Sequence, residues 1–208
     1  MIQYSSFSMI ETKGERTKSS ILTIAADIAS LKGLDQMSIG DVAKAANLSR
    51  SGLFAHFQSK EQMQIAVLQF AEELFLKIVI APCEKASGGF QKLDLLRQHW
   101  PGWFDRTEHK MRGGCIFLTA IFEFDDQKGP VRDFLIDQQQ RLQKYIGKCF
   151  EQARQEGVFG SAYDKFQFAY EFYSLYMGYH YGHKFFGDAK ALGRFNKAID
   201  LLFERAKK

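Results

Sequence analysis

The sequence contains few residues that interrupt helices and few patterns that would form strands. Only three prolines occur in 208 residues, at Pro82, Pro101 and Pro130. Runs in which Val, Ile or Thr alternate with polar residues are scarce. Proline removes a backbone N–H and breaks helix interiors, so its rarity favours long helices. We therefore predict an all-α fold.

Cysteines and long apolar runs are also scarce. Cys83, Cys115 and Cys149 are odd in number and widely spaced, which argues against a disulfide framework or a zinc ribbon. No segment approaches the roughly 18 consecutive apolar residues of a membrane span. The first residues lack the basic start and apolar run of a secretory signal. We expect a cytoplasmic protein with no membrane partner.

Charge of one sign is not concentrated in the sequence either. The net charge is +4, and residues 1–65 hold seven Lys or Arg against six Asp or Glu. An excess of one does not by itself identify a nucleic-acid-binding protein. The sequence also has no phosphate-cradling glycine loop, nucleophile elbow or metal-ligand signature. It predicts no enzyme, no cofactor and no metal site.

Near its start, the sequence predicts two very short helices within SIGDVAKAANLSRSGLFAHF (38–57). Ser38, Ser49 and Ser59 are each placed to cap a following helix, and Asn47 suits a left-handed turn between the first two. A longer helix is expected before them, from about 17 to 32. Its apolar stripe would consist of Ile21, Ile24, Ala25, Ile28 and Leu31. This order is typical of a helix-turn-helix unit, whose second short helix enters the DNA major groove.

Polar residues around the second short helix are the candidates for DNA contact. They are Ser38, Arg50, Ser51, Gly52, His56 and Lys60. Arg50 would contact a base edge, and Gly52 would let the backbone approach the DNA closely. Lys60 lies at a helix N-terminus, an unfavourable end for a cation unless a phosphate binds there. Each residue could instead be an ordinary solvated surface residue.

The stretch from about Thr17 to Phe70 resembles the N-terminal domain of the TetR family of bacterial transcriptional repressors. The resemblance is carried by AANLS (45–49), RSGLFAHF (50–57) and SKEQM (59–63). Asn47 stands in place of the usual glycine, and Met63 in place of a leucine. Phe54 replaces a tyrosine whose hydroxyl commonly touches a phosphate, so we expect Phe54 only to pack.

The resemblance implies a two-part molecule. Residues 13–60 would be the DNA-binding domain, and residues 61–208 a helical domain for effector binding and dimerisation. A homodimer, formed through the last two long helices, would bind a near-palindromic double-stranded DNA operator. The predicted function is a transcriptional repressor released from its operator by a small apolar or aromatic ligand. The alternative is a constitutive DNA-binding dimer with no effector, which would need no cavity.

Beyond the short helices, the sequence predicts a series of longer ones. The expected ranges are about 60–78, ending before Pro82, then 90–106, 114–124, 130–156, 163–186 and 188–206. Residues 166–186 are dense in Phe and Tyr, which suits a core, a dimer interface or a pocket for a flat apolar effector. The candidate pocket residues are Trp100, Trp103, Phe104, Phe117, Ile121, Phe172 and Tyr176. Taken singly, each of them fits an ordinary core better than a pocket.

Cys115 and a histidine pair have two interpretations each. Cys115 is expected to open a helix, and the sequence favours a buried, small apolar side chain at this position. A redox or electrophile sensor, whose thiol pKa the helix N-terminus would lower, is the alternative. His180 and His183 are three residues apart and could bind a metal. Since no third ligand lies at close spacing, the sequence favours ordinary polar residues in or near a dimer interface.

Overall fold

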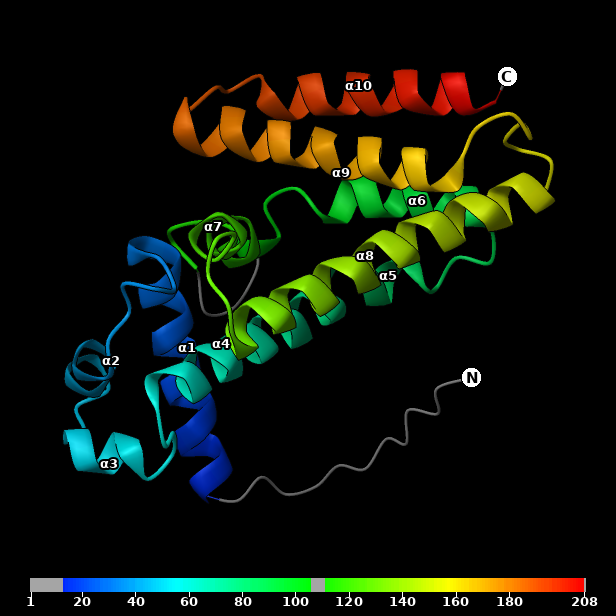
Figure 1. Ribbon diagram of the computed structural model, residues 1–208. Helices are drawn as coiled ribbons and strands as arrows, with labels where there is room; N and C mark the ends of the chain where they lie inside the picture. Colours follow the sequence, from blue (N-terminus) through cyan, green and yellow to red (C-terminus); the bar gives the residue numbers. More distant parts are fainter. Residues whose placement is uncertain (1–12, 106–110, 208) are drawn as a thin grey trace.

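The chain is built from helices, as Figure 1 shows for the computed structural model, which describes residues 13–105 and 111–207. No strand occurs within these ranges, so the predicted all-α fold is confirmed. In chain order the elements are α1 (Lys13–Lys32), α2 (Ile39–Ala45), α3 (Arg50–Phe54), α4 (Lys60–Phe75), the π-helical turn η1 (Leu76–Ile80), α5 (Ala81–Cys83), α6 (Gly89–His99), the 3-10 turn η2 (Trp103–Asp105), α7 (Ile116–Glu123), α8 (Pro130–Gln155), α9 (Lys165–His180), the π-helical turn η3 (Tyr181–Phe185) and α10 (Ala191–Ala206).

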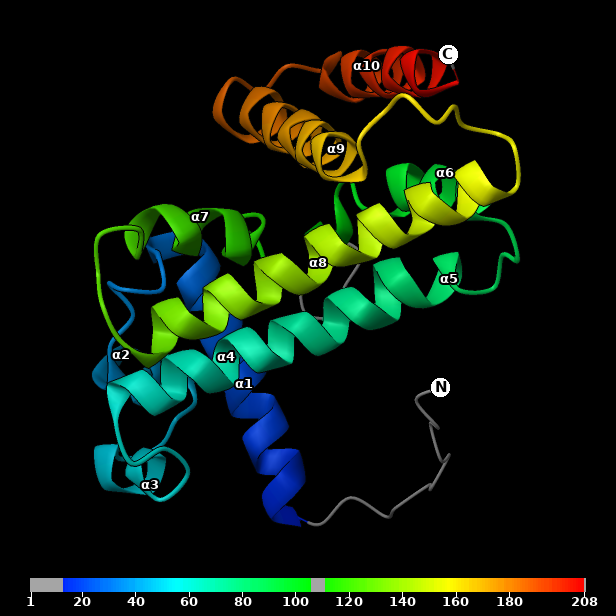
Figure 2. The ribbon, with the colours of Figure 1, turned by 45° about the vertical axis from the view of Figure 1, so that its right-hand side comes forward.

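Helices α1, α2 and α3 form a small unit at one end of the molecule, and α4 leads away from it (Figures 1 and 2). Ser38, Ser49 and Ser59 each accept a hydrogen bond from a backbone N–H in the first turn of α2, α3 and α4, as predicted. Asn47 has a φ of 54°, the only positive φ of a non-glycine residue in the described part of the chain. The predicted left-handed turn between α2 and α3 is therefore confirmed.

The buried side of this unit differs from the predicted stripe at one position. Ile21 and Ala25 are buried as expected, but Leu31 is 53% exposed. Ala29 and Ser30 are buried in its place, because this part of α1 packs against residues 112–114 as well as against its own domain. Small side chains permit that close approach, and a leucine would not.

Several helix bounds differ from those predicted. The third helix ends at Phe54 and not near Phe57. The fourth does not stop before Pro82, because η1 continues it and α5 then places proline in its first turn, where no backbone N–H is needed. The helix expected over 90–106 ends at His99, since Pro101 and Gly102, with a φ of 65°, form a turn before η2. Residue 106 lies outside the described ranges.

The C-terminal part is layered around α8, a helix of 26 residues. Gly129 and Pro130 begin it as predicted, with proline at the first helical position. Helices α4 to α6 pack on one side of α8 and α9 packs on another. Helix α10 lies against α9 as the outermost layer, away from α2 and α3 (Figure 2). The core between these layers is rich in buried aromatic side chains.

Candidate DNA-binding surface and effector site

The outward side of α3 presents polar residues, while its inward side is anchored. Leu53 and Phe57 are buried, whereas Arg50 and Ser51 are exposed. The Arg50 guanidinium extends toward α2, so that a Cβ added at Gly40 would lie 3.3 Å from Arg50 Nη2. The short helix α3, anchored on its inward side, thus presents an arginine where a helix that reads a DNA groove needs one.

The other candidate DNA contacts surround this helix. Gly52 donates its backbone N–H to Ser49 Oγ at 3.0 Å, so Gly52 belongs to the cap of α3. His56 is partly buried in the turn that follows α3. Both therefore lie close to Arg50 and Ser51 in the same short segment.

Ser38 and Lys60 are engaged within the protein. Ser38 Oγ donates to Asp41 Oδ2 at 2.9 Å, and the hydrogen bond from Ser38, followed by contacts from Lys32, lowers the pKa of Asp41. Lys60 Nζ donates to the backbone oxygen of Asp35. A phosphate contact by Lys60 would have to replace that bond.

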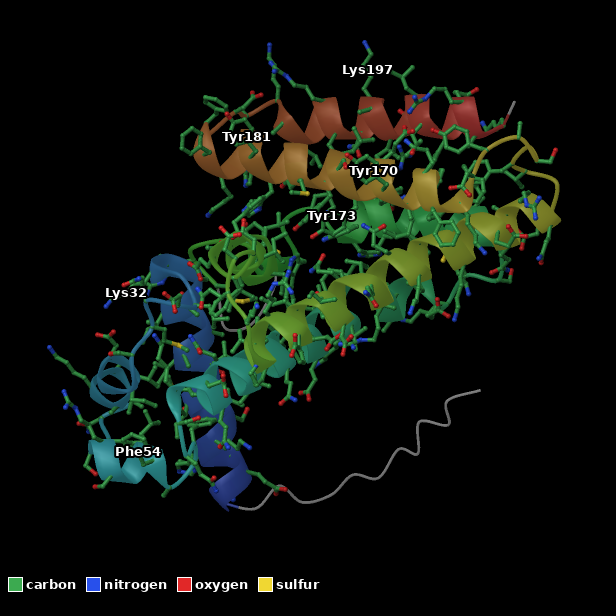
Figure 3. All side chains as sticks on the ribbon, viewed as in Figure 1. Lys32, Phe54, Tyr170, Tyr173, Tyr181 and Lys197 are labelled. Carbon is green, nitrogen blue, oxygen red and sulfur yellow. The ribbon has the colours of Figure 1, made fainter. Side chains whose placement is uncertain are left out.

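Phe54 does not pack as expected. Its ring is 47% exposed, and Figure 3 shows it on α3, at the end of the molecule far from α9 and α10. Leu53 of α3 and Phe57, which follows α3, fill the buried space behind this five-residue helix. No buried place is left there for a third large side chain. Phe54 follows Arg50 by four residues, so the two share the outward side.

Six of the seven candidate pocket residues meet in one aromatic cluster. Its members are Trp100, Trp103, Phe104, Phe117, Phe172 and Tyr176, all buried. The rings of Trp100 and Tyr176 stack with centroids 4.1 Å apart, and Trp103 stacks on Phe117 at 6.2 Å. At this separation no ligand fits between the Trp100 and Tyr176 rings as they stand.

The seventh candidate, Ile121, lines a separate pocket of about 430 Å³ between α7 and α8. Tyr173 of α9 also contributes to its wall. Figure 3 shows Tyr173 on the side of α9 that faces the rest of the domain. A larger groove of about 710 Å³ lies between α8 and the N-terminal part of α9, with Gly147 and Ala169 among its lining residues.

The aromatic cluster contains polar atoms that sequence reasoning missed. Trp103 Nε1, the Tyr176 hydroxyl and His180 Nδ1 are buried and have no hydrogen-bond partner among the described residues. Burial, aided by the neighbouring Lys184 and His183, lowers the pKa of His180 to about 4, so this imidazole is neutral at pH 7. These atoms come from segments far apart in the sequence, and they lie near one another only because α7, η2 and α9 pack together.

Cys115 lies at the same place and is buried, in agreement with the favoured interpretation of its sequence position. It precedes α7, but burial raises the pKa of its thiol. The alternative, in which the helix N-terminus lowers the thiol pKa, is therefore wrong, because desolvation of the thiolate outweighs the effect of the helix. Burial also raises the pKa of Cys83 to about 12 and that of Cys149 to about 11. All three thiols are therefore protonated at neutral pH.

Helix α7 joins the aromatic cluster to the DNA-binding unit. Just before it, Arg112 Nη2 bonds to Asp27 Oδ2 of α1 at 2.6 Å, and Gly113 donates its N–H to Ser30 Oγ at 3.0 Å. At its other end, Glu123 accepts from the backbone N–H of Asp35 at 3.0 Å. We call these contacts the α1–α7 junction.

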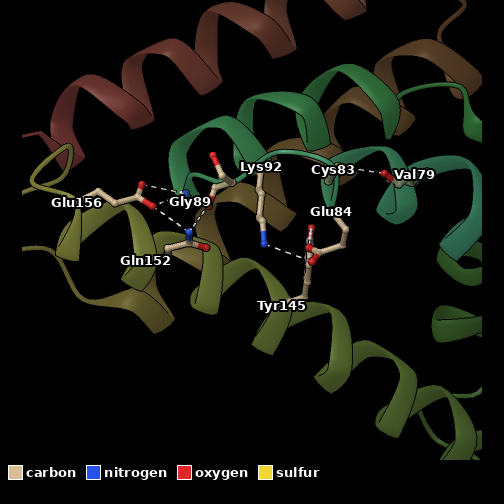
Figure 4. Close-up of polar contacts among 9 residues, drawn as sticks. Val79, Cys83, Glu84, Gly89, Lys92, Tyr145, Gln152 and Glu156 are labelled. Carbon is tan, nitrogen blue, oxygen red and sulfur yellow. Dashed lines mark hydrogen bonds and ion pairs between the residues drawn. The ribbon is translucent and has the colours of Figure 1, made fainter. Parts of the chain in front are cut away.

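A further set of polar contacts fixes α5 and α6 on α8 (Figure 4). The Tyr145 hydroxyl donates to Glu84 Oε1 at 2.8 Å, and the backbone N–H of Gly89 donates to Glu156 Oε2 at 3.0 Å. A Cβ at Gly89 would lie 2.3 Å from the Cys149 carbonyl oxygen. This close approach explains why a glycine begins α6.

The outer side of α9 and α10 is unusually apolar for an exposed surface. Two grooves of about 540 and 630 Å³ run along it. Their lining residues include Tyr170, Ser174, Leu175, Gly178, Tyr181, Phe186, Ala198 and Leu201, which we call the α9–α10 outer face. Exposed apolar patches of this kind mark interaction sites.

The described residues form neither a metal-ion site nor a membrane-spanning helix. No group of three or more His, Cys, Asp or Glu within residues 13–105 and 111–207 is arranged to hold a metal ion. His183 instead stacks on Tyr179, with ring centroids 5.4 Å apart. None of the described helices is both long and apolar enough to cross a membrane.

Comparison with known families assigns both parts of the chain. Residues 21–67 match the model of the bacterial regulatory proteins of the tetR family. Residues 89–199, more than half of the chain, match the model of the tetracyclin repressor-like C-terminal domain. No curated protein matches the chain in sequence.

Solved structures share the fold along nearly the whole chain. A TetR transcriptional regulator from Chloroflexus aurantiacus is 20% identical with a TM-score of 0.80, covering 92% of this chain and 94% of that one. A transcriptional regulator from Saccharomonospora viridis, in complex with choline, is 18% identical with a TM-score of 0.75, covering 92% and 97%. AibR, in complex with isovaleryl coenzyme A and operator DNA, is 20% identical with a TM-score of 0.70, covering 92% and 98%.

The helix-turn-helix unit joined to a helical C-terminal domain defines a DNA-binding transcriptional regulator and not an enzyme. More particularly, the chain belongs to the TetR family. Proteins of this family act as dimers, with DNA and small-molecule effectors as partners.

Proposed function

We propose that this regulator is a repressor that binds a near-palindromic operator as a homodimer and is released by a small apolar or aromatic ligand. The exposed outward side of α3, with Arg50 and Ser51 held over a buried anchor, is the observation that carries the DNA-binding part. Such a protein would work in the cytoplasm, where the chromosome lies. In this proposal residues 13–60 form the DNA-binding domain, and residues 61–208 form the domain for effector binding and dimerisation.

Ligand-responsive release is supported by the route from the aromatic cluster to α1. Helix α7 contributes Phe117 to the cluster, and contacts of the α1–α7 junction lie at both of its ends. A ligand that separates α7 from α9 would shift Arg112 and Glu123 against α1. It can release DNA only if it binds the DNA-incompetent arrangement more tightly. The relatives solved with choline and with isovaleryl coenzyme A favour a small-molecule effector here.

The tight ring packing of the cluster favours the second candidate, a constitutive DNA-binding dimer without an effector. Trp100 and Tyr176 fill the space between them. The pocket beside Ile121 and the unpartnered polar atoms favour the first candidate instead. The two differ by linkage: an effector must bind operator-free protein more tightly than operator-bound protein, typically by 5–150-fold.

The DNA-binding part is tested by recovering an operator from random DNA with the purified protein. We expect Arg50→Ala to cost about 1–3 kcal/mol of binding free energy and to relax preference at one operator position. Lys60→Ala should weaken binding to all sequences alike and reduce the salt slope by about one unit. Lys77→Ala is the control, because Lys77 is exposed on η1, outside the DNA-binding unit. Equal, sequence-independent losses in the first two variants would refute the role of Arg50.

A further inference from the structure

Three buried polar atoms converge in the aromatic cluster. Trp103 and Tyr176 are almost completely buried. Trp103 Nε1, the Tyr176 hydroxyl and His180 Nδ1 all lack a hydrogen-bond partner in the described part of the chain. Buried polar groups are paired in the great majority of cases, since water has been removed from them. Three exceptions together indicate a site made for something other than protein.

These atoms belong to one site. Tyr176 and His180 are one turn apart on α9, with ring centroids 6.5 Å apart. The Cys115 thiol lies within side-chain hydrogen-bonding reach of both the Trp103 indole and the Tyr176 hydroxyl, and these two contacts act against the rise in the thiol pKa that burial causes. Sulfur is a weak acceptor, so it does not satisfy either donor well.

The chemistry of the site selects its guest. The indole N–H of Trp103 is a donor only, and the Tyr176 hydroxyl has a hydrogen to donate. A cation borders the site, since Lys184 Nζ lies 5.6 Å from the centroid of the Phe104 ring. Donors in a positively biased, apolar surrounding suit an oxygen acceptor and oppose a cation.

We propose that the effector is a flat apolar compound carrying a carbonyl-type oxygen, as in a ketone or carboxylate. This oxygen accepts hydrogen bonds from Trp103 Nε1 and the Tyr176 hydroxyl. The rings of Trp100, Phe104 and Phe117 surround the apolar part. The inference rests on the proposed function, in that the compound is the one that releases the operator.

In this proposal the guest enters from the pocket of about 430 Å³ whose wall includes Ile121 and Tyr173. Tyr173 lies near Cys115, since the thiol contributes to the raised pKa of the Tyr173 hydroxyl. The ring of Tyr176 must leave its stack with Trp100 for the guest to enter. Occupation therefore moves α9 relative to α7, which carries the α1–α7 junction.

The test compares probes of equal shape. Equilibrium dialysis of the full chain would use 2-acetylnaphthalene and 2-naphthoate against 2-ethylnaphthalene, which lacks the acceptor. Acetophenone against ethylbenzene repeats the comparison at smaller size. We expect at least one oxygen compound to bind about tenfold or more tightly than its hydrocarbon, because the site's donors reject a guest that cannot accept. The cation (2-naphthylmethyl)trimethylammonium should bind no better than the hydrocarbon. Equal affinities, or no binding of any oxygen compound, would overturn the proposal.

Tyr176→Phe supplies the matched variant, since it removes the hydroxyl and keeps the ring. The preference for the oxygen compound should fall several-fold, and the Tm of the free protein should stay level or rise. Tyr163→Phe is the control, because the Tyr163 hydroxyl already donates to Glu171 Oε1 at 2.7 Å, away from the cluster. A Tm in Tyr176→Phe several degrees below that of the parent would show that water satisfies the hydroxyl, and would overturn the assignment.

Operator affinity measured with the same probes separates the two proposals. The oxygen compounds could bind with the expected preference and leave operator affinity unchanged. That result would support the proposed hydrogen bonds to the ligand oxygen and refute release of the operator by this ligand. The ammonium probe could instead release the operator while the oxygen compounds do not bind. That result would support release of the operator by a ligand and refute the proposed carbonyl-type oxygen.

Discussion

Phe54 is the residue at which this chain departs most clearly from its family's DNA-binding pattern. The ring is half exposed on the same side of α3 as Arg50, so a hydroxyl added at its tip would meet solvent or DNA and not the core. We predict that Phe54→Tyr tightens operator binding by about 0.5–1.5 kcal/mol, the value of one hydrogen bond. The slope of affinity against salt should not change, because a hydroxyl releases no counterion.

Fluorescence anisotropy on labelled operator measures this gain, with Tm as the control for folding. Phe57→Tyr gives a contrast, since Phe57 is buried and its new hydroxyl would be desolvated at a cost in stability. Unchanged operator affinity in Phe54→Tyr would mean that the ring does not face a phosphate.

His180 should make stability depend on pH in a defined window. Its pKa is lowered to about 4 by burial, then by Lys184 and His183, whereas an unfolded histidine titrates near 6.5. Between these values the unfolded chain binds more protons, so stability is full above pH 6.5 and is lost as pH falls toward 4. We expect this residue to account for roughly 1–2 kcal/mol, reduced from the full shift because its ring is partly exposed.

Urea unfolding at pH 4.5 and pH 7 measures the effect. His180→Asn should lose less stability than the parent on acidification, whereas His56→Asn, in the DNA-binding unit, should follow the parent. If the stability of the parent and that of His180→Asn depended on pH in the same way, protonation of His180 would not be the cause of the loss.

At the scale of elements, local signals were predictable and long-range contacts were not. The caps at Ser38, Ser49 and Ser59 and the turn at Asn47 depend on neighbours within a few residues, so the sequence identifies them. Continuation of the fourth helix through Pro82 depends on a π-helical turn, which no local signal announces. The exposure of Leu31 depends on residues 112–114, some eighty positions away.

The α1–α7 junction gives the strongest prediction at this scale. A Cβ at Gly113 would lie 1.6 Å from the Ser30 carbonyl oxygen, so Gly113→Ala must push α7 away from α1. We expect the free energy of unfolding to fall by at least about 1–3 kcal/mol, the usual cost of overpacking. Operator affinity should change too, because α1 supports α2 and α3.

The control is Gly193→Ala in α10. No atom lies within 4 Å of a Cβ built there, and alanine favours a helix over glycine by about 0.5–1 kcal/mol. Chemical denaturation compares the two variants. A Gly113→Ala protein as stable as the parent would show that the two helices are not held together at this point.

For the molecule as a whole, the sequence predicted the kind of protein better than its effector site. A motif of about fifty residues was enough to suggest the family, because the spacing of caps, turn and apolar positions is specific. Six of the seven candidate pocket residues meet in the aromatic cluster, and their role in binding an effector stays a prediction. The unpartnered donors of the cluster were not predicted, because Trp103 and Tyr176 are brought together only by folding.

Assembly is the remaining question at this scale, and the α9–α10 outer face makes it testable. A dimer that binds a near-palindromic operator must present its two copies of α3 to half-sites about one helical turn apart, ~34 Å. The face combines small residues, such as Ser174 and Gly178, with the exposed apolar Leu201. Small residues let two helix pairs approach closely, and apolar side chains stabilise the contact between them.

We predict that the parent sediments as a dimer at micromolar concentration and that Gly178→Arg together with Leu201→Arg gives a folded monomer. A large cation on each helix would be desolvated without a partner in the dimer, a cost far above that of a surface substitution. Operator affinity should then fall steeply, because the second half-site no longer binds as part of the same molecule. Leu76→Arg is the control, since Leu76 is exposed on η1, outside the proposed interface. Sedimentation of the parent as a monomer, with and without operator, would exclude this mode of assembly and with it the near-palindromic operator.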